Sequence, residues 1–284
     1  MIEDQGARYD RIAEGYARHW APVIRAAAVR LLDDLAPLLP PGPTGDATPS
    51  AHLLDIGTGT GTLALRAIER WPGVCVTGID ASSEMARFAD GEAGRSLPAA
   101  SRDRFRTTVA FADRLPFADA EFDGAMSSFV LQLVPSRAAA LREARRVLRP
   151  GAPLGYVTWL LRDDGAVDPP DRIFEEVLDE FGFDPPEPDP GERDPASPMA
   201  ASNQMRRAGF RDVQARAEVM THRWTPRGYV DFLEQFSEES LFDELVERER
   251  RALRRRLLER LGELAPRDLR FVHPIVYVTG RAAG

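Results

Sequence analysis

The chain is poor in cysteine and in long apolar runs. Its 284 residues include one cysteine, Cys75, which excludes an internal disulfide framework and a thiolate metal cluster and fits a reducing compartment. No apolar run approaches the roughly 20 residues that cross a bilayer. The opening residues MIEDQGARYD lack the basic start and the apolar stretch of a signal peptide. We therefore expect a cytoplasmic protein with no membrane insertion and no metal site.

Positive charge is scarcer than negative charge. The formal net charge is -8, so the average surface repels phosphate backbones and anionic membranes. Nucleic acid is therefore not expected as a partner. The length suffices for one large domain, or for one domain with a substantial insertion, and its core needs no disulfides.

Five short apolar runs alternate with helical segments in the middle of the chain. The runs are HLLDIG, VCVTGID, TTVAFA, FDGAMSSF and PLGYVTWL. Between them lie TLALRAIERW, SSEMARFADG and SRAAALREARRVLRPG, whose apolar residues recur at helical spacing. Strands that alternate with helices predict parallel pairing through right-handed crossovers, and hence a doubly wound α/β sheet.

The segments on either side of this core have different compositions. Before it, two helical patterns and a linker rich in proline and glycine predict a helical cover. After it comes an acidic, proline-rich segment with one predicted helix near residues 172–181, which suggests an inserted, partly flexible lid. A short helix, two strands and two further helices are expected beyond the lid. One of these helices is amphipathic, with an apolar stripe of Leu253, Leu257, Leu258 and Leu261 and with Glu and Arg on its outside. The predicted division is a cover at 1–40, a core at 50–160, a lid at 161–200 and a C-terminal part at 201–284.

The stretch LLDIGTGTG, residues 53–61, joins the first predicted strand to its helix. Glycine occupies every second position from Gly57 to Gly61, so we expect backbone to pass close to a ligand there. The phosphate loop of NTPases needs a Lys and then Ser or Thr after its last glycine, whereas Thr62 and Leu63 follow here. A dinucleotide loop has the spacing G-x-G-x-x-G, and this third glycine comes one residue early. Asp80 nevertheless ends the second strand where such folds place an acid that binds ribose, so the glycines alone leave an oxidoreductase open.

Asp55, at the end of the first predicted strand, favours a different ligand. A carboxylate at this position attracts an ammonium group and repels a pyrophosphate. A nucleoside that carries an amino acid therefore fits better than a dinucleotide.

Four consecutive segments resemble class I S-adenosylmethionine-dependent methyltransferases: LLDIGTGTGTLALRAIER, VTGIDASSEMARFA, LPFADAEFDGAMSSFVLQLV and EARRVLRPGAPLGYVTW. The resemblance is to the small-molecule subgroup, with ubiquinone/menaquinone-type and natural-product enzymes, and it covers roughly residues 9–160. It implies a Rossmann-like, mostly parallel seven-stranded sheet with S-adenosylmethionine as the cofactor. The implied reaction is methyl transfer to an O, N or C atom of a small organic metabolite, in secondary metabolism.

The resemblance also implies the cofactor contacts. Gly57, Gly59 and Gly61 would hold the methionine moiety, with Thr58 at a position where relatives often carry Cys or Ser. On the residues alone, three glycines that serve only a tight turn are not expected, because one glycine would suffice.

Asp80 is expected to accept hydrogen bonds from the ribose hydroxyls. Its alternative role is to cap the following helix, which Ser82 or Ser83 could do instead. Ala81 and Met85 would lie near the adenine, although Met85 could also belong to the core.

The adenine motif departs from the pattern of the resembled family. Relatives commonly carry an Asp followed by Ala before LPF, whereas this chain has Phe111, Ala112 and Asp113. Either Phe111 packs beside the base, or a local shift lets Asp113 take over the contact, while Ala112 would contribute its backbone N–H. Ser128, at the end of the fourth predicted strand, is expected at the same edge of the sheet.

The entry helix supplies two more candidates. Tyr9 and Tyr16 resemble the Y-D-x-x-A-x-x-Y helix that covers the cofactor, and Tyr16 could bond its carboxylate or place a ring near the sulfonium. Helix packing is the alternative for either ring. His19 and His222 are the candidate catalytic bases, although methyl transfer needs a base only where the nucleophile carries a tightly held proton.

Two other functions compete with this interpretation. One is a nicotinamide-dependent oxidoreductase, and the other is a methyltransferase-like protein that binds a cofactor without turnover. A small-molecule substrate is expected as the partner, and a homodimer is compatible with the sequence.

Overall fold

The structure is a computed structural model, and it describes residues 5–40, 50–162, 165, 167–183 and 194–284. Most of the predicted linker and part of the predicted lid fall on residues outside these ranges. The described residues form one seven-stranded sheet in the order β3-β2-β1-β4-β5-β7-β6. Its strands are β1 (Ser50–Ile56), β2 (Gly73–Asp80), β3 (Phe105–Val109), β4 (Gly124–Ser128), β5 (Pro153–Trp159), β6 (Phe210–Arg223) and β7 (Arg270–Ala282).

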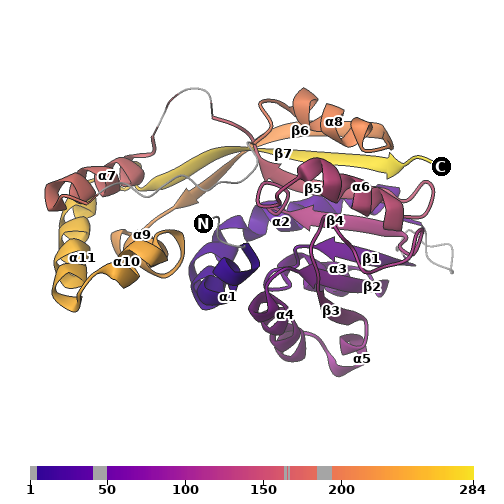
Figure 1. The fold of residues 1–284 in the computed structure, drawn as a ribbon, viewed down its shortest axis with the longest axis horizontal. Helices are drawn as coiled ribbons and strands as arrows, with labels where there is room; N and C mark the ends of the chain where they lie inside the picture. The colour runs from indigo at the N-terminus through magenta and orange to yellow at the C-terminus, as the bar shows by residue number, and fades with distance from the viewer. Residues whose placement is uncertain (1–4, 41–49, 163–164, 166, 184–193) are drawn as a thin grey trace.

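Strands β1 to β5 are parallel, and helices cover both faces of this part of the sheet (Figure 1). Leu53 belongs to the core on one face and Leu54 to the core on the other, because successive side chains of a strand point to opposite sides. The helices that follow the strands are α3 (Thr62–Arg70), α4 (Ser83–Ser96), α5 (Ala99–Arg102), α6 (Arg137–Val147) and α8 (Pro198–Arg207). The predicted α/β class with a mostly parallel seven-stranded sheet is confirmed.

Strand β7 runs antiparallel between β5 and β6 and extends well past β5. Its pairing with β5 ends where Ile275 faces Trp159, whereas Arg270–Pro274 pair with β6 alone. We call these five rows of β7 and β6 the arm. In Figure 1 the arm extends away from the sheet and carries a group of helices at its end.

This group, the cap, combines helices that are distant in sequence. It consists of α7 (Pro169–Phe181), α9 (Pro226–Phe232), the π-helical turn η3 (Leu233–Ser237), α10 (Glu239–Glu244) and α11 (Glu247–Gly262). Helix α11 packs on both α7 and α9, with Leu253, Leu257 and Leu261 fully buried. The apolar stripe predicted for α11 thus packs against the other helices of the cap. The arginines of α11 form ion pairs on its outer side, including those of Arg260 with Glu176 and Glu180.

The two predicted N-terminal helices are joined without a break. Helix α1 (Gln5–Gly15) continues through the π-helical turn η1 (Tyr16–Trp20) into α2 (Ala21–Leu35). Within η1 the N–H of Ala21 bonds to the carbonyl of Tyr16, five residues back. Pro22, which has no N–H, follows directly, so the wider turn accommodates a residue that would disrupt a regular helix interior. A short 3-10 turn, η2 (Ala36–Leu38), ends this region.

The structure refines several predicted boundaries. Strand β3 ends at Val109, so Ala110 to Ala112 of the predicted run lie beyond it. Residue 200, the predicted end of the lid, lies within α8, which packs on β6. The one lid helix, α7, belongs to the cap together with helices from the predicted C-terminal part. The division at residues 160 and 200 therefore stays a prediction about domains.

Gly15 is a point of close contact between the N-terminal helix and the cap. A Cβ atom at Gly15 would lie 1.6 Å from the backbone oxygen of Gln235 in η3. Because that neighbour is backbone, Gly15→Ala is expected to push the cap away and to destabilise the protein by about 1–3 kcal/mol, as measured by urea unfolding. Gly94→Ala is the matched control, since nothing lies within 4 Å of its Cβ position in α4. Equal stability of the two variants would contradict the close contact.

Candidate active site

The glycine loop after β1 depends on left-handed backbone at all three glycines. Their φ angles are 71° at Gly57, 53° at Gly59 and 81° at Gly61. Residues with a Cβ adopt such angles only at a cost, so the expectation that one glycine would suffice for the turn is wrong. The backbone conformation by itself requires glycine three times.

The surroundings of the three glycines also differ. A Cβ at Gly57 would lie 2.2 Å from Cγ2 of Val130, and one at Gly61 would lie 3.3 Å from Ala89. Both glycines therefore face protein atoms. At Gly59 the nearest neighbour is Tyr16, 3.6 Å away, so Gly59 is the glycine of the three that faces uncrowded space.

Asp55 is buried at the base of this loop, with 1% of its surface exposed. Its Oδ2 accepts a hydrogen bond of 2.9 Å from the hydroxyl of Thr58, while Oδ1 accepts none from the described residues. Burial, with a smaller contribution from the Asp80 charge, raises the pKa of Asp55 to about 7, while hydrogen bonds from Thr58 and from the backbone of Ala64 oppose this rise. A buried acceptor without a donor is costly, so this oxygen is a candidate contact for a cationic group.

Thr58 is used mainly inside the protein. Besides the bond to Asp55, its N–H donates to the carbonyl of Ile79 at 2.7 Å, and its side chain packs where Gly78 leaves room for it. The Thr58 carbonyl also accepts from the N–H of Gly61 at 2.8 Å, so its hydroxyl and backbone all have partners within the protein, and its contact with a cofactor stays a prediction.

Asp80, at the end of β2, is held by two backbone donors. The N–H of Gly59 donates to Oδ2 at 2.8 Å and that of Ser82 to Oδ1 at 3.0 Å. The cap of α4 is Ser82, whose hydroxyl accepts from the N–H of Met85. The alternative role of Asp80 as the helix cap is therefore not supported. Burial raises the pKa of Asp80, and the backbone N–H groups of Ser82 and Gly59 oppose this.

Helix α1 is tied to this region through Asp10, which the sequence interpretation missed. The Asp10 carboxylate accepts from the hydroxyl of Ser82 at 2.6 Å and from the N–H of Glu84 at 3.0 Å. The N–H of Glu84 and the Ser82 hydroxyl lower the pKa of Asp10. Asp10 belongs to the quoted Y-D-x-x-A-x-x-Y pattern, but its partners lie more than 70 residues away and could not be read from it.

Tyr16 connects the glycine loop to the cap. Its ring lies over Gly59 and makes an edge contact with Phe236 of η3, at a centroid distance of 5.6 Å. Burial raises the pKa of Tyr16 well above its ordinary value, with further contributions from Tyr9, Asp80 and Asp55. The phenol therefore stays neutral and can donate a hydrogen bond.

The predicted adenine residues lie at the ends of β2 and β3. Phe111 is 41% exposed, an unusual position for a large apolar ring, while Ala112, Asp113 and Ala81 are half-buried. Met85 is 1% exposed, so the alternative of core packing applies to its side chain. The two proposed ways of reading Phe111 and Asp113 both stay open.

Ser128 ends β4, and the residue after it is strained. Phe129 has φ 55°, a left-handed conformation that costs a bulky residue about 1–3 kcal/mol. Hydrogen bonds to Val157 and from Gln132 hold its backbone. Strain of this kind concentrates at functional sites, and here it lies directly before Val130, the residue that packs on Gly57.

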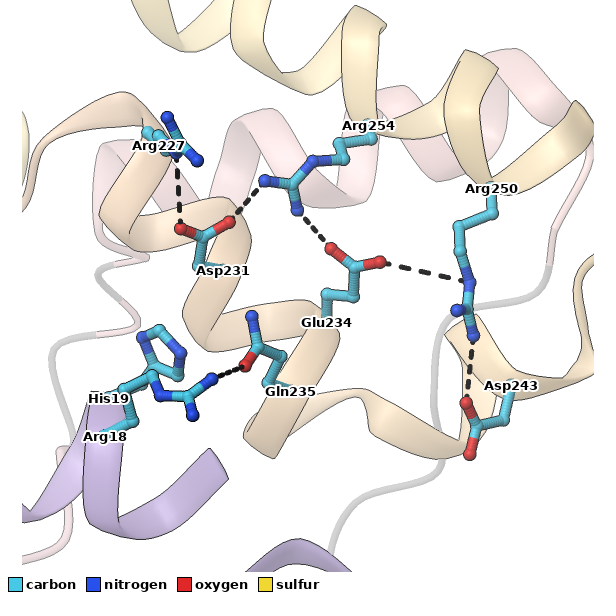
Figure 2. Close-up of a pocket in the computed structure, with 9 residues that line it drawn as sticks. All are labelled: Arg18, His19, Arg227, Asp231, Glu234, Gln235, Asp243, Arg250 and Arg254. Carbon is cyan, nitrogen blue, oxygen red and sulfur yellow. Dashed lines mark hydrogen bonds and ion pairs between the residues drawn. The ribbon is translucent and has the colours of Figure 1, made fainter. Parts of the chain in front are cut away.

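The candidate base His19 lies in a charged cavity of about 620 Å³. Figure 2 shows its ring beside Arg18, opposite the helix that carries Asp231 and Gln235. Nε2 of His19 is buried and has no hydrogen-bond partner in the described part of the chain. The structure therefore places His19 between η1 and the cap, on a wall of this cavity.

Ion pairs line most of the cavity and link the cap helices. Arg254 donates to both Asp231 and Glu234, and Arg250 pairs with Asp243 at 2.9 Å (Figure 2). Arg18 reaches from η1 to Gln235 at 3.3 Å. The positive and negative charges that line the cavity largely compensate one another. The ion pairs and hydrogen bonds therefore form a network that joins the cap to the N-terminal helix.

The second candidate base, His222, lies on the arm. Its ring makes an edge contact with Trp224 at 4.4 Å, and burial lowers its pKa. His222 faces Phe271 across the strand pair. The structure thus places the two histidines in different surroundings, and the catalytic role of each stays a prediction.

Among the described residues, no group of three His, Cys, Asp or Glu side chains could hold a metal ion. The helices of the same residues are all too short or too polar to cross a membrane.

Comparison with known proteins shows which protein family the parallel part of the sheet resembles. Residues 53–151 match the methyltransferase domain family, and this match covers the glycine loop, Asp80 and the strained turn after β4. Together with the sheet order and the antiparallel β7, the match makes this segment similar to methyltransferase domains in both sequence and fold.

A curated relative of the methyltransferase domain is the ubiquinone/menaquinone biosynthesis C-methyltransferase UbiE of Geotalea daltonii. It is 41% identical over 106 residues, which are 36% of this chain and 43% of the relative. The chain spans only about 40% of the length of the first curated relatives that it matches. The similarity to these relatives therefore concerns only the matched segment, and the activity of the whole protein must be inferred from other observations.

Two solved structures share the fold over nearly the whole chain. The cyclase SpnF has a TM-score of 0.59 at 20% identity, and the match covers 99% of this chain and 96% of SpnF. Phosphoethanolamine N-methyltransferase 2 of Haemonchus contortus, in complex with phosphomonomethylethanolamine and S-adenosylhomocysteine, has a TM-score of 0.58 at 17% identity. That match covers all of this chain and 61% of the other. At these identities the similarity shows the fold alone.

The pKa of Asp55 predicts a pH-dependent stability. Because the folded pKa of about 7 lies above the unfolded value, its contribution to stability is present at low pH and is lost as the pH rises toward 7. Asp55→Asn should therefore gain about 2 kcal/mol in unfolding free energy relative to wild type between pH 5 and pH 8, as measured by urea unfolding without ligand. Asp33→Asn, an exposed partner of Arg70, should show no such gain. Parallel pH profiles of wild type and Asp55→Asn would contradict the assignment.

Proposed function

We propose that the protein transfers a methyl group from S-adenosylmethionine to an O, N or C atom of a small organic metabolite, in secondary metabolism. The observation that carries the proposal is the buried Oδ1 of Asp55, which lacks a donor among the described residues and lies at the glycine loop of a methyltransferase domain. The α-ammonium group of S-adenosylmethionine is the kind of donor that this oxygen requires.

Asp80 supports the same ligand. Each of its carboxylate oxygens accepts one backbone N–H, and each retains a further lone pair for a ribose hydroxyl. The two backbone bonds fix the orientation of the carboxylate in advance. The proposed contacts around the adenine and the edge of the sheet are completed by Ala81, Ala112, Phe111 or Asp113, and Ser128.

The residues of the chain would act mainly by positioning and shielding the reactants. S-adenosylmethionine, when bound, supplies an electrophilic methyl group on a positively charged sulfur. Methyl transfer by in-line displacement depends on alignment, and η1 with Tyr16 covers the loop from the cap side. The neutral phenol of Tyr16 can donate a hydrogen bond, and its ring face favours a nearby cation. His19 and His222 stay candidates for a base where the acceptor must lose a proton.

The proposal extends to partners and location. We infer a small-molecule substrate, no nucleic acid partner and a cytoplasmic protein, with a homodimer left open. The net charge of -8 and the single cysteine support these inferences.

Binding and turnover experiments test the proposal together. Calorimetric titration is expected to show binding of S-adenosylmethionine and none of NAD. Asp80→Ala should weaken the affinity for S-adenosylmethionine by about 1–3 kcal/mol, the scale of hydrogen bonds to a charged group. Asp90→Ala, which removes an exposed carboxylate on α4, should leave the affinity unchanged.

Turnover requires a separate measurement, because one neighbour of the same fold is a cyclase. Incubation with methyl-labelled S-adenosylmethionine and a metabolite extract should transfer the label to a small molecule. Tight cofactor binding without any labelled product would favour a cofactor-binding protein without methyl transfer. Preferential binding of NAD would favour the oxidoreductase.

A further inference from the structure

Aromatic side chains from six parts of the chain converge beside the proposed cofactor site. We call them the aromatic cluster: Trp20 of η1, Phe129 after β4, Trp159 of β5, Phe232 of α9, Phe236 of η3 and Phe271 of the arm. Two of the four tryptophans in the chain belong to it. The cluster therefore lies where the N-terminal helix, the carboxyl edge of the sheet and the cap meet.

The rings are arranged for contact on both faces and edges. Trp20 stacks on Phe236 at a centroid distance of 5.9 Å and an interplanar angle of 18°. Trp20 and Phe271 form an edge-to-face pair with centroids 5.7 Å apart and an interplanar angle of 84°, and the ring centroids of Phe129 and Trp159 lie 4.3 Å apart. Offset-stacked and edge-to-face pairs are the favourable arrangements of aromatic rings.

The cluster is continuous with the glycine loop. Phe129 is the strained residue directly before Val130, which packs on Gly57. On the other side, Tyr16 lies over Gly59 and contacts Phe236 at 5.6 Å. A molecule that rests on the cluster would thus lie beside the glycine loop, where the cofactor is proposed to bind.

Four members of the cluster keep part of their surface in solvent. Trp20, Trp159, Phe232 and Phe271 are half-buried, although the cap fully buries other rings such as those of Tyr229 and Phe242. Leaving large aromatic surface in water forgoes burial free energy. A ligand that covered the remaining surface of these four rings would recover that burial free energy.

We propose that the methyl acceptor is a planar aromatic molecule that binds against the rings of Trp20, Trp159 and Phe271. Its nucleophilic atom would point toward Phe129 and toward Tyr16, which lies beside the cluster. A binding surface made of aromatic rings favours a planar aromatic molecule over a saturated molecule with the same carbon skeleton, because pairs of aromatic rings attract one another beyond the effect of apolar burial. This inference rests on the proposed function and specifies its substrate class.

A matched pair of probes tests the inference on the full-length protein. 2-Naphthol and decahydro-2-naphthol share a carbon skeleton and a hydroxyl, and differ in aromaticity. With the protein saturated by S-adenosylhomocysteine, calorimetric titration should show that 2-naphthol binds about tenfold more tightly, the scale of one or two aromatic pairs. Equal or weaker binding of 2-naphthol would overturn the inference, since an apolar surface without aromatic selectivity favours the saturated compound.

A variant that removes one aromatic ring tests whether 2-naphthol binds at the cluster. Phe271→Leu keeps an apolar side chain and should weaken 2-naphthol binding about fivefold, with binding of decahydro-2-naphthol and S-adenosylhomocysteine unchanged. Phe181→Leu is the matched control, because Phe181 stacks on Phe183 at 5.9 Å outside the cluster, and it should change none of the three affinities. Unchanged 2-naphthol binding in Phe271→Leu would overturn the inference.

The two proposals fail in different ways. If S-adenosylhomocysteine binds and 2-naphthol is not preferred, the aromatic acceptor alone is refuted. If S-adenosylhomocysteine does not bind, both proposals fall together. The probe comparison on the wild-type protein does not depend on the folding of any variant.

Discussion

The buried carboxylate of Asp55 is the constraint around which the site is organised. One oxygen is held by Thr58, and the other accepts nothing from the described residues, so the protein keeps an acid at a pKa of about 7. The glycine loop begins shortly after this carboxylate. Its three left-handed glycines return the chain over the end of β1, and Gly59 is then tied by its N–H to Asp80 on the next strand. The carboxylates of Asp55 and Asp80 therefore both lie at the glycine loop. This arrangement suits a ligand that carries an ammonium group and a ribose.

The cover over this loop depends on contacts that are long-range in sequence. Asp10 attaches α1 to the first turn of α4, and the missing Cβ of Gly15 lets η3 approach the helix. Arg18 and Tyr16 then link η1 to the cap through Gln235 and Phe236. The arm carries the cap away from the parallel sheet (Figure 1), and these contacts connect the cap to the glycine loop.

The parallel core could be predicted from sequence because its signals are local. Apolar runs such as VCVTGID and helical segments such as TLALRAIERW alternate at short spacing, and the motif order fixes the topology. The arm and cap could not be predicted in the same way. The stripe of Leu253, Leu257 and Leu261 indicated an amphipathic helix but not its partners α7 and α9, and Pro22 did not reveal a π-helical turn. In the site, the acids were visible at strand ends, whereas the packing of Val130 on Gly57 and the bonds of Asp10 arise only on folding.

Proton release on cofactor binding tests the central role of Asp55 most directly. Titration of S-adenosylmethionine at pH 6, in two buffers of different ionisation enthalpy, measures the number of protons exchanged. A pKa of about 7 leaves Asp55 mostly protonated in the free protein, and an ammonium group at Oδ1 would favour the ionised form. The account predicts release of nearly one proton in wild type and none in Asp55→Asn. Binding without proton release at this pH, or equal release in both proteins, would contradict it.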